Sequence, residues 1–90
     1  MLVKKKIVTI IGLGLIGSSI LRAFSYYLKN KFYIKVYDNN SEHLKVVKSF
    51  NIADEICNSA EDSVKDSDLV ILAIPVGSMA EVGKLISPYL

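Results

Sequence analysis

The residues best suited to chemistry in this sequence are three glycines and one aspartate. Gly12, Gly14 and Gly17 have the spacing G-x-G-x-x-G, and Asp38 comes 21 residues after the last of them. A glycine turn with this spacing lets the backbone approach a pyrophosphate closely, and an acidic residue about 20 residues further on can accept hydrogen bonds from a ribose hydroxyl. The pattern therefore predicts a binding site for a dinucleotide.

Each glycine has a separate physical task in this prediction. Gly12 permits a tight turn out of a strand, Gly14 leaves room for the pyrophosphate, and Gly17 lets the following helix pack close against the strand. The free N–H groups of the first helical turn, around Leu15 and Ile16, then point at the phosphates, whose negative charge the helix dipole favours. The sequence lacks a G-K-[ST] ending, which excludes a phosphate loop of the nucleoside-triphosphatase type.

A strand, a turn and a helix are needed to position these residues. Residues 7–11 are rich in β-branched side chains, and residues 15–27 have apolar side chains at helical spacing. A basic cluster at residues 4–6 followed by an apolar run also resembles a signal peptide, but no small-residue cleavage site follows. The run is shorter than the roughly 18 apolar residues of a membrane span. We therefore expect the opening of a buried nucleotide-binding domain, with no membrane contact.

The rest of the sequence alternates expected strands and helices. The continuous apolar run at residues 69–74 is typical of a parallel strand that is covered on both faces. The expected elements after the first helix are a strand at 32–37, a helix capped by Ser41, a short strand within 52–57, a helix from Ser59 to about Lys65, the strand at 69–74, and a helix from Ser78 to Pro88.

This alternation predicts an α/β fold of the Rossmann type, a partial doubly wound parallel sheet with strand order 3-2-1-4 and helices on both faces. The first and fourth strands would be neighbours at the topological switch point, where ligands bind outside the carboxyl ends of the strands. Residues 12–17 and 74–76 would line that crevice from two sides, and Asp38 would end the strand beside the first.

Composition excludes several other classes of function. The chain has 90 residues, a net charge of +2, one cysteine and one histidine. So small a charge on scattered lysines argues against a nucleic-acid surface. Cys57 alone cannot form an internal disulfide and fits a reducing compartment, so we expect a cytoplasmic location and no metal site. We expect His43 on a surface helix, solvated and without a carboxylate partner.

Four stretches of the sequence carry a resemblance: IIGLGLIGSSILRA from Ile10, VYDNN from Val36, NIADEI from Asn51 and DSDLVILAIPVG from Asp66. Together they resemble the cofactor domain of the prephenate and arogenate dehydrogenases. These enzymes of tyrosine biosynthesis oxidatively decarboxylate prephenate or arogenate with NAD or NADP. The glycine motif is shared with many dehydrogenases, whereas the Asp54-Glu55 pair and the run from Ala73 to Gly77 are more specific.

The resemblance implies a role for each matching residue. The glycines would hold the pyrophosphate, Asp38 the adenosine ribose, and residues 74–76 would lie along the cofactor. Many members have an arginine just after the acidic residue, whereas this chain has Asn39, which favours NAD over NADP. The full set of expected cofactor contacts is Gly12, Leu13, Gly14, Leu15, Ile16, Gly17, Asp38, Asn39, Ile74, Pro75 and Val76.

The family's catalytic residues lie beyond the region that matches. Its catalytic histidine, its serine, its substrate-binding arginines and the helical domain that completes the active site have no counterpart here. We therefore expect residues 1–90 to be the N-terminal part of a dinucleotide-binding domain, inactive alone. The resemblance implies that the full-length enzyme is a homodimer that acts on a small dicarboxylate.

Two other interpretations fit the same residues. One is the cofactor domain of another two-domain reductase, of the 3-hydroxyacid or pyrroline-carboxylate type. The other is a non-catalytic regulatory module that senses dinucleotides, as in the cytosolic domains of potassium transporters. Residues beyond Leu90 would discriminate, because a downstream histidine loop and a helical domain support the dehydrogenase.

Overall fold

Strands and helices alternate through the residues that the computed structural model describes, which are 5–28 and 30–90. The basic cluster discussed above begins at Lys4, outside the described residues. None of the helices in these ranges combines the length and the apolar character needed to cross a membrane. In chain order the elements are β1 (Lys6–Ile11), α1 (Leu15–Tyr27), β2 (Phe32–Tyr37), α2 (Ser41–Phe50), β3 (Glu55–Ile56), α3 (Ala60–Val64), β4 (Leu69–Leu72), α4 (Val76–Ile86) and a 3-10 turn (Ser87–Tyr89).

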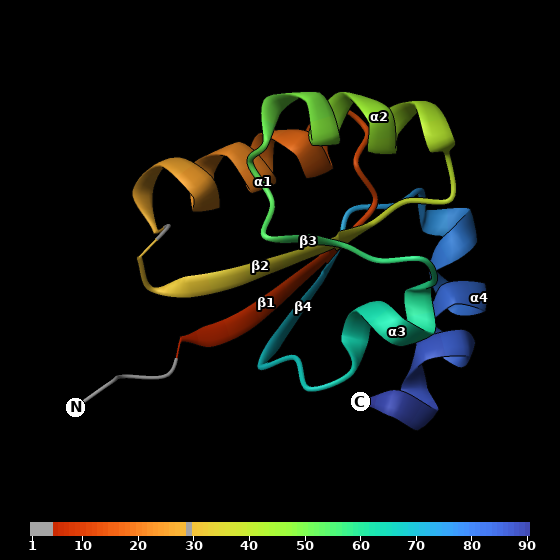
Figure 1. The fold of residues 1–90 in the computed structure, drawn as a ribbon. Coiled ribbons are helices and arrows are strands. Elements are labelled where there is room, and N and C mark those ends of the chain that lie inside the picture. Colours follow the sequence, from red (N-terminus) through yellow and green to blue (C-terminus); the bar gives the residue numbers. More distant parts are fainter. Residues whose placement is uncertain (1–4, 29) are drawn as a thin grey trace.

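The strands form one parallel sheet in the order β3-β2-β1-β4 (Figure 1). This is the order predicted from the sequence, so the prediction of a doubly wound α/β fold is confirmed. The register pairs Ile11 at the end of β1 with Tyr37 on one side and with Leu72 on the other. The carboxyl ends of β1, β2 and β4 therefore lie level with one another at one edge of the sheet.

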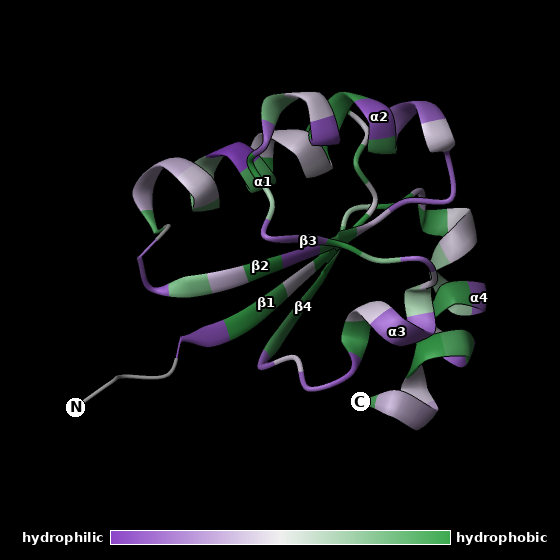
Figure 2. Ribbon diagram, viewed as in Figure 1, coloured by the Kyte–Doolittle hydropathy of each residue, from purple (hydrophilic) through white to green (hydrophobic). Residues whose placement is uncertain are grey.

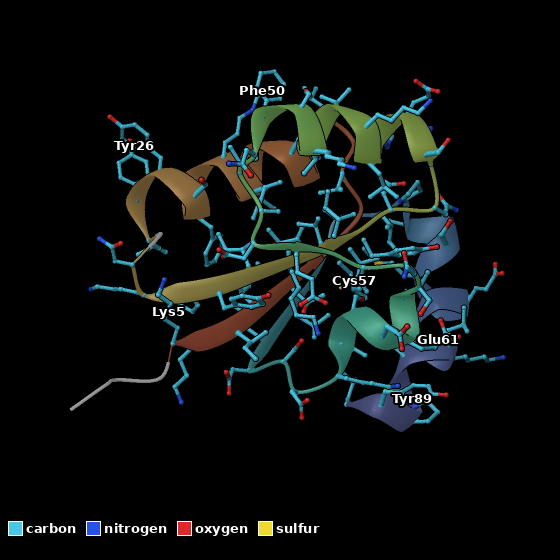
Figure 3. All side chains as sticks on the ribbon, in the orientation of Figure 1. Lys5, Tyr26, Phe50, Cys57, Glu61 and Tyr89 are labelled. Carbon is cyan, nitrogen blue, oxygen red and sulfur yellow. The ribbon has the colours of Figure 1, made fainter. Side chains whose placement is uncertain are left out.

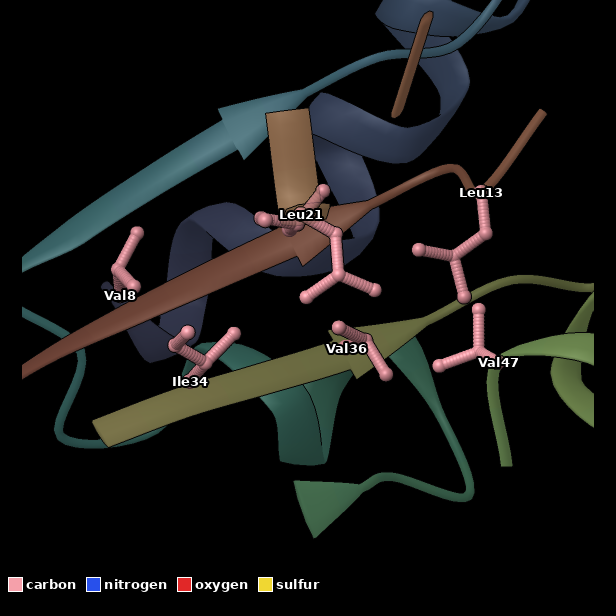
Figure 4. Packing of buried hydrophobic residues seen from close by; sticks show 7 residues of the cluster. Val8, Leu13, Leu21, Ile34, Val36 and Val47 are labelled. Atoms are coloured by element: carbon pink, nitrogen blue, oxygen red, sulfur yellow. The ribbon is translucent and has the colours of Figure 1, made fainter. Parts of the chain in front are cut away.

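One face of the sheet is covered by α1 and α2 and is apolar (Figure 1). Alternate side chains of a strand point to opposite faces. Val8, Ile10, Ile34 and Val36 share this face, and each is at most 2% exposed. They pack with Leu21 of α1 in the larger of the two hydrophobic clusters (Figure 4). Burial of this cluster fixes α1, and with it the glycine turn, against the strands.

The opposite face, covered by α3 and α4, mixes apolar and polar contacts. Figure 2 shows β1 and β4 as largely hydrophobic and the turn before β4 as hydrophilic. Thr9 and Lys35 are buried on this face. The ammonium group of Lys35 donates hydrogen bonds to the carbonyl oxygens of Asp62 and Lys65, at 3.2 and 3.1 Å. These bonds satisfy carbonyls at the C-terminal end of α3, which is too short to be stable by itself.

Two helices, α2 and α4, begin one or two residues earlier than the sequence suggested. The cap of α2 is Asn40 rather than Ser41, because the Asn40 side chain accepts a hydrogen bond from the first helical turn at 2.9 Å. Helix α4 begins at Val76, directly after Pro75, rather than at Ser78. Pro75 is the N-cap of α4, with ψ 144°, and proline is tolerated there because the helix needs no N–H from its cap residue.

One strand is shorter than expected, whereas a predicted short strand and a predicted cap are confirmed. The short strand expected within residues 52–57 is β3, but β4 ends at Leu72 instead of Ile74. The Ser59 hydroxyl accepts a hydrogen bond from Asp62 N at 3.1 Å and caps α3, as predicted. Because β4 ends early, residues 73–75 form a loop that borders the cavity described below.

Cys57 is a buried free thiol in the segment that joins β3 to α3 (Figure 3). Burial is the main reason that its pKa is raised from 9.0 to about 11, with the charge of Glu55 adding to the effect and Lys35 opposing it. The thiol stays protonated near neutral pH, so Cys57 behaves as a small apolar residue.

Candidate functional site

A cavity of about 490 Å³ lies at the carboxyl ends of β1, β2 and β4. Its lining comes from the glycine turn, the loop after β2 with the start of α2, the start of α3, and the loop after β4 with one face of α4. Small-molecule and cofactor sites have volumes of ~300–1,000 Å³. In open α/β sheets such sites lie at the topological switch point, and this cavity occupies that position.

Two glycines of the turn are required by packing. Gly12 has φ +100°, in the left-handed region that favours glycine, and a Cβ there would overlap the carbonyl oxygen of Ala73. A Cβ at Gly17 would overlap the carbonyl oxygen of Gly12 and lie 3.2 Å from Ala73 Cβ. The turn after β1, the start of α1 and the loop after β4 therefore meet without space for a methyl group. The predicted tasks of Gly12 and Gly17 in turning and in close packing are confirmed.

Gly14 has the opposite environment. Apart from its chain neighbours, no described residue has an atom within 4 Å of the position that its Cβ would take, and Gly14 lines the cavity. It is also the N-cap of α1, so the helix begins at the cavity wall. The first N–H groups of a helix have no partner within the helix, and together with the helix dipole they bind anions. This end of the cavity can therefore hold a phosphate group.

The carboxylate of Asp38 joins the glycine turn to the loop after β2. Oδ2 accepts a hydrogen bond from Leu13 N at 2.6 Å, and Oδ1 accepts one from Asn40 N at 2.8 Å. Burial is the largest influence on the pKa of Asp38 and raises it, but hydrogen bonds from Leu13, Asn40 and His43 together outweigh burial and lower the pKa below its usual 3.8. Asp38 is therefore an ionised acceptor at neutral pH.

His43 does have a carboxylate partner, so the expectation that it is solvated and unpaired is wrong. Its Nδ1 lies 2.8 Å from Asp38 Oδ2. The physical reason is the tight turn between β2 and α2, which brings the first turn of the helix back over the strand end. His43 is a lining residue of the cavity as well.

The structure divides the expected cofactor contacts into three groups. Leu13 and Gly17 are buried, and the N–H of Leu13 is already bonded to Asp38. Leu15, Ile16 and Val76 are 87%, 71% and 83% exposed and lie beside the cavity, at the starts of α1 and α4. The residues that line the cavity itself are Gly12, Gly14, Asp38, Asn39, Ile74 and Pro75.

Sequence reasoning missed the contribution of α3 and α4 to the cavity. Glu61 lies in the first turn of α3, and Ser78, Glu81 and Leu85 lie along α4. A signal was available, because residues three, four and seven apart share one face of a helix. Placing that face of the helix after the fourth strand toward the switch point would have predicted its contribution to the cavity.

The described lining of the cavity carries carboxylates and neither lysine nor arginine. Asp38, Glu61 and Glu81 come from three different elements, and His43 is the one residue of this lining that can carry a positive charge. Negative groups of a ligand must therefore be held by backbone N–H groups and the dipole of α1 rather than by cationic side chains. The wall around Asp38 disfavours additional negative charge.

A parallel sheet of order 3-2-1-4, with a glycine turn after its first strand and an acidic residue ending its second, defines a Rossmann-type nucleotide-binding domain. The model of the protein family described as NADP oxidoreductase, coenzyme F420-dependent, matches residues 7–90. The chain belongs to this family.

Two known dehydrogenases are similar to the chain. The cyclohexadienyl dehydrogenase of Zymomonas mobilis subsp. mobilis is 35% identical over 85 residues, which are 94% of this chain and 29% of that protein. The crystal structure of prephenate dehydrogenase from A. aeolicus, in complex with hydroxyphenyl propionate and NAD+, superposes with a TM-score of 0.78 at 30% identity. The match covers 98% of this chain and 31% of that one. The chain thus spans less than a third of each relative, and its resemblance to the prephenate dehydrogenases is confirmed.

Proposed function

We propose that this chain is the NAD-binding part of a prephenate or arogenate dehydrogenase. The observation that carries the proposal is the cavity between Gly14 and Asp38, open at the glycine and acidic at the strand end. The pyrophosphate would lie against Gly14 and the first turn of α1, where backbone N–H groups can donate to it. The adenosine ribose would lie at Asp38. When bound, NAD supplies the acceptor for a hydride.

The charge of the lining supports NAD over NADP. A carboxylate accepts hydrogen bonds from a ribose hydroxyl, and hydrogen bonds to charged groups contribute ~1.5–3 kcal/mol. A 2′-phosphate would instead lie beside the like charge of Asp38, in a cavity whose lining also carries the carboxylates of Glu61 and Glu81. Because ~1.4 kcal/mol is a factor of ten in affinity, we expect at least a tenfold preference for NAD near neutral pH.

For the full-length protein we propose oxidative decarboxylation of a small dicarboxylate, prephenate or arogenate, by a cytoplasmic homodimer. The support is similarity to relatives that are dehydrogenases, one of them a prephenate dehydrogenase. The free, buried thiol of Cys57 fits a reducing compartment. In this proposal residues 1–90 form the N-terminal part of the dinucleotide-binding domain.

Calorimetric titration of the chain with NAD and NADP tests the binding proposal. We expect NAD to bind, NADP to bind at least tenfold more weakly near neutral pH, and Asp38→Ala to narrow the difference. Absence of heat and of any spectroscopic change with both dinucleotides would refute the proposed site. Tighter binding of NADP by the unmutated chain would refute the role given to Asp38.

The chain alone should not catalyse the reaction. Hydride transfer needs the substrate held against the nicotinamide, and positioning of this kind contributes up to ~7–11 kcal/mol. The described cavity has no arginine or lysine that could hold a dicarboxylate. Absorbance at the NADH band, followed with prephenate and with arogenate, should stay flat, and measurable turnover would contradict this part of the proposal.

A further inference from the structure

His43 is a titratable side chain of the cavity to which the proposed function gives no task. Its Nδ1 lies 2.8 Å from Asp38 Oδ2, and its side chain is 41% exposed. The ring therefore lies beside the carboxylate proposed to hold the ribose, and both residues line the cavity. A group in this position must affect whatever binds at Asp38.

The hydrogen bonds of Asp38 leave little capacity for a ligand on one of its two oxygens. Oδ2 is shared by Leu13 N–H and the His43 ring, whereas Oδ1 accepts only from Asn40 N among the described residues. A carboxylate offers about four lone-pair positions. One remains on Oδ1, so a ribose diol that uses both oxygens must displace His43 from Oδ2.

The charge state of the ring decides what His43 presents to a ligand. Because Asp38 is an ionised acceptor, Nδ1 carries a hydrogen, and in the neutral ring Nε2 is then a bare acceptor. Protonation turns Nε2 into a donor, adds a positive charge and strengthens the bond to Asp38. A 2′-hydroxyl gains nothing from this change, whereas a 2′-phosphate gains both a donor and an opposite charge.

The other charged groups of the cavity are mostly negative, so protonation of His43 changes the balance of charge in the lining. Besides Asp38 at the end of β2, the cavity brings in Glu61 from α3 and Glu81 from α4. On its own helix, Glu42 is paired with Lys45 at 3.5 Å. Among the described lining residues, protonated His43 is thus the only cation in a cavity that also carries three carboxylates.

We propose that His43 is a specificity-determining residue of this site, whose neutral ring favours NAD and whose protonated ring narrows that preference. It acts on the ribose through Asp38, as a positioning residue, and on a 2′-phosphate through its charge. The inference rests on the proposed function, because it assumes that the adenosine end of a dinucleotide lies at Asp38. Protonation of the ring depends on pH, so the preference for NAD over NADP depends on pH as well.

The first test follows the ring of His43 directly in the unmutated chain. Because the chain has one histidine, its imidazole proton resonance needs no assignment by mutation. We expect the midpoint of the ring titration to lie about one pH unit higher with saturating NADP than with saturating NAD. This follows from linkage, since a tenfold change in relative affinity on protonation equals one unit of midpoint. Equal midpoints in the two complexes would overturn the inference.

The second test compares the affinities for NAD and NADP at pH 6 and pH 8 in the unmutated chain, His43→Gln and His43→Lys. A phosphate monoester itself titrates near pH ~6, and that contribution is common to all three proteins. The NAD preference of the unmutated chain should fall, from pH 8 to pH 6, about tenfold more than that of His43→Gln. His43→Lys carries a positive charge at both pH values, so its preference for NAD over NADP should be smaller than that of His43→Gln at both.

The outcomes separate this inference from the proposed function. A preference for NAD over NADP with the same pH dependence in the unmutated chain and in His43→Gln would overturn the role of His43 and leave the dinucleotide site standing. Failure of both dinucleotides to bind the unmutated chain, at either pH, would overturn both. Should a variant fail to fold, the titration of the unmutated chain still decides.

Discussion

The glycine-rich turn has a packed side and an open side, although the residue type is the same on both. At Gly12 and Gly17 a Cβ would overlap backbone oxygens of the fold itself. At Gly14 a Cβ would meet no described residue within 4 Å beyond the chain neighbours, and Leu15 and Ile16, which follow it, are exposed. Two glycines are thus explained by the folded chain alone, whereas the third is explained only if something outside the chain comes close.

This difference separates two roles of the glycine motif, one in the stability of the fold and one in ligand binding. The packed side concerns stability and should respond to substitution in the absence of any ligand. The open side concerns binding and should respond only when a ligand is present. Variants of single residues can therefore test the fold and the function one at a time.

The largest expected effect is on the packed side, from Gly17→Ala. Its methyl group must push α1 away from Gly12, and overpacking of this kind costs typically 1–3 kcal/mol, here at the upper end because backbone atoms oppose it. For a domain of this size a loss of ~3 kcal/mol lowers Tm by more than ~10 °C. Thermal melts without ligand provide the measurement.

Gly83→Ala on α4 is the matched control for that variant. A Cβ at Gly83 meets nothing within 4 Å, and the residue lies inside a helix. Alanine should stabilise the chain there by roughly 0.5–1 kcal/mol, since it loses less entropy than glycine on folding. A Gly17→Ala variant as stable as Gly83→Ala would contradict the packed contact.

The second effect is at the carboxylate that joins the two sides, and Asp38→Ala should lower stability by roughly 1–3 kcal/mol. The reason is that the N–H of buried Leu13 loses its acceptor. Asp62→Ala serves as the control, because the side chain of Asp62 forms an exposed ion pair with Lys65 at 3.2 Å, of the kind that contributes ~0–1 kcal/mol, and the substitution keeps the backbone groups of Asp62. Chemical denaturation of both variants should rank them in this order. Equal losses would argue against the role of Asp38 in holding the turn.

A smaller effect should appear on acidification. The pKa of Asp38 is lowered below 3.8 in the folded chain, so below that pH the unfolded chain takes up a proton more readily than the folded one. The stability that Asp38 contributes is present above pH 3.8 and is lost as the pH falls through the folded-state pKa. The free energy of unfolding, measured by chemical denaturation between pH 5 and 2.5, should fall more steeply with decreasing pH for the unmutated chain than for Asp38→Asn. The same pH dependence in both proteins would contradict the lowered pKa of Asp38.

How much of this could be predicted from the sequence depends on the range of the interactions. The strand order and the tasks of Gly12 and Gly17 follow from hydrophobic runs and a motif whose geometry is fixed by backbone sterics. The pairing of Asp38 with His43 depends on how tightly one short loop turns, and sequence periodicity does not specify that. The N-cap at Asn40 was not predicted because Asn40 and Ser41 are both favourable N-cap residues, and their types do not decide between them.

The central claim is that the open side of the glycine turn is open for a dinucleotide, and Gly14→Ala tests it most directly. Calorimetric titration with NAD should be run on this variant and on the unmutated chain, after melts have shown equal folding. We predict a change in stability of at most about 1 kcal/mol, because the site has room for a methyl group and alanine is only a poorer N-cap than glycine. NAD binding should be weakened at least tenfold, because the methyl group occupies the space that the pyrophosphate needs. Equal affinity of the two proteins for NAD would contradict the account.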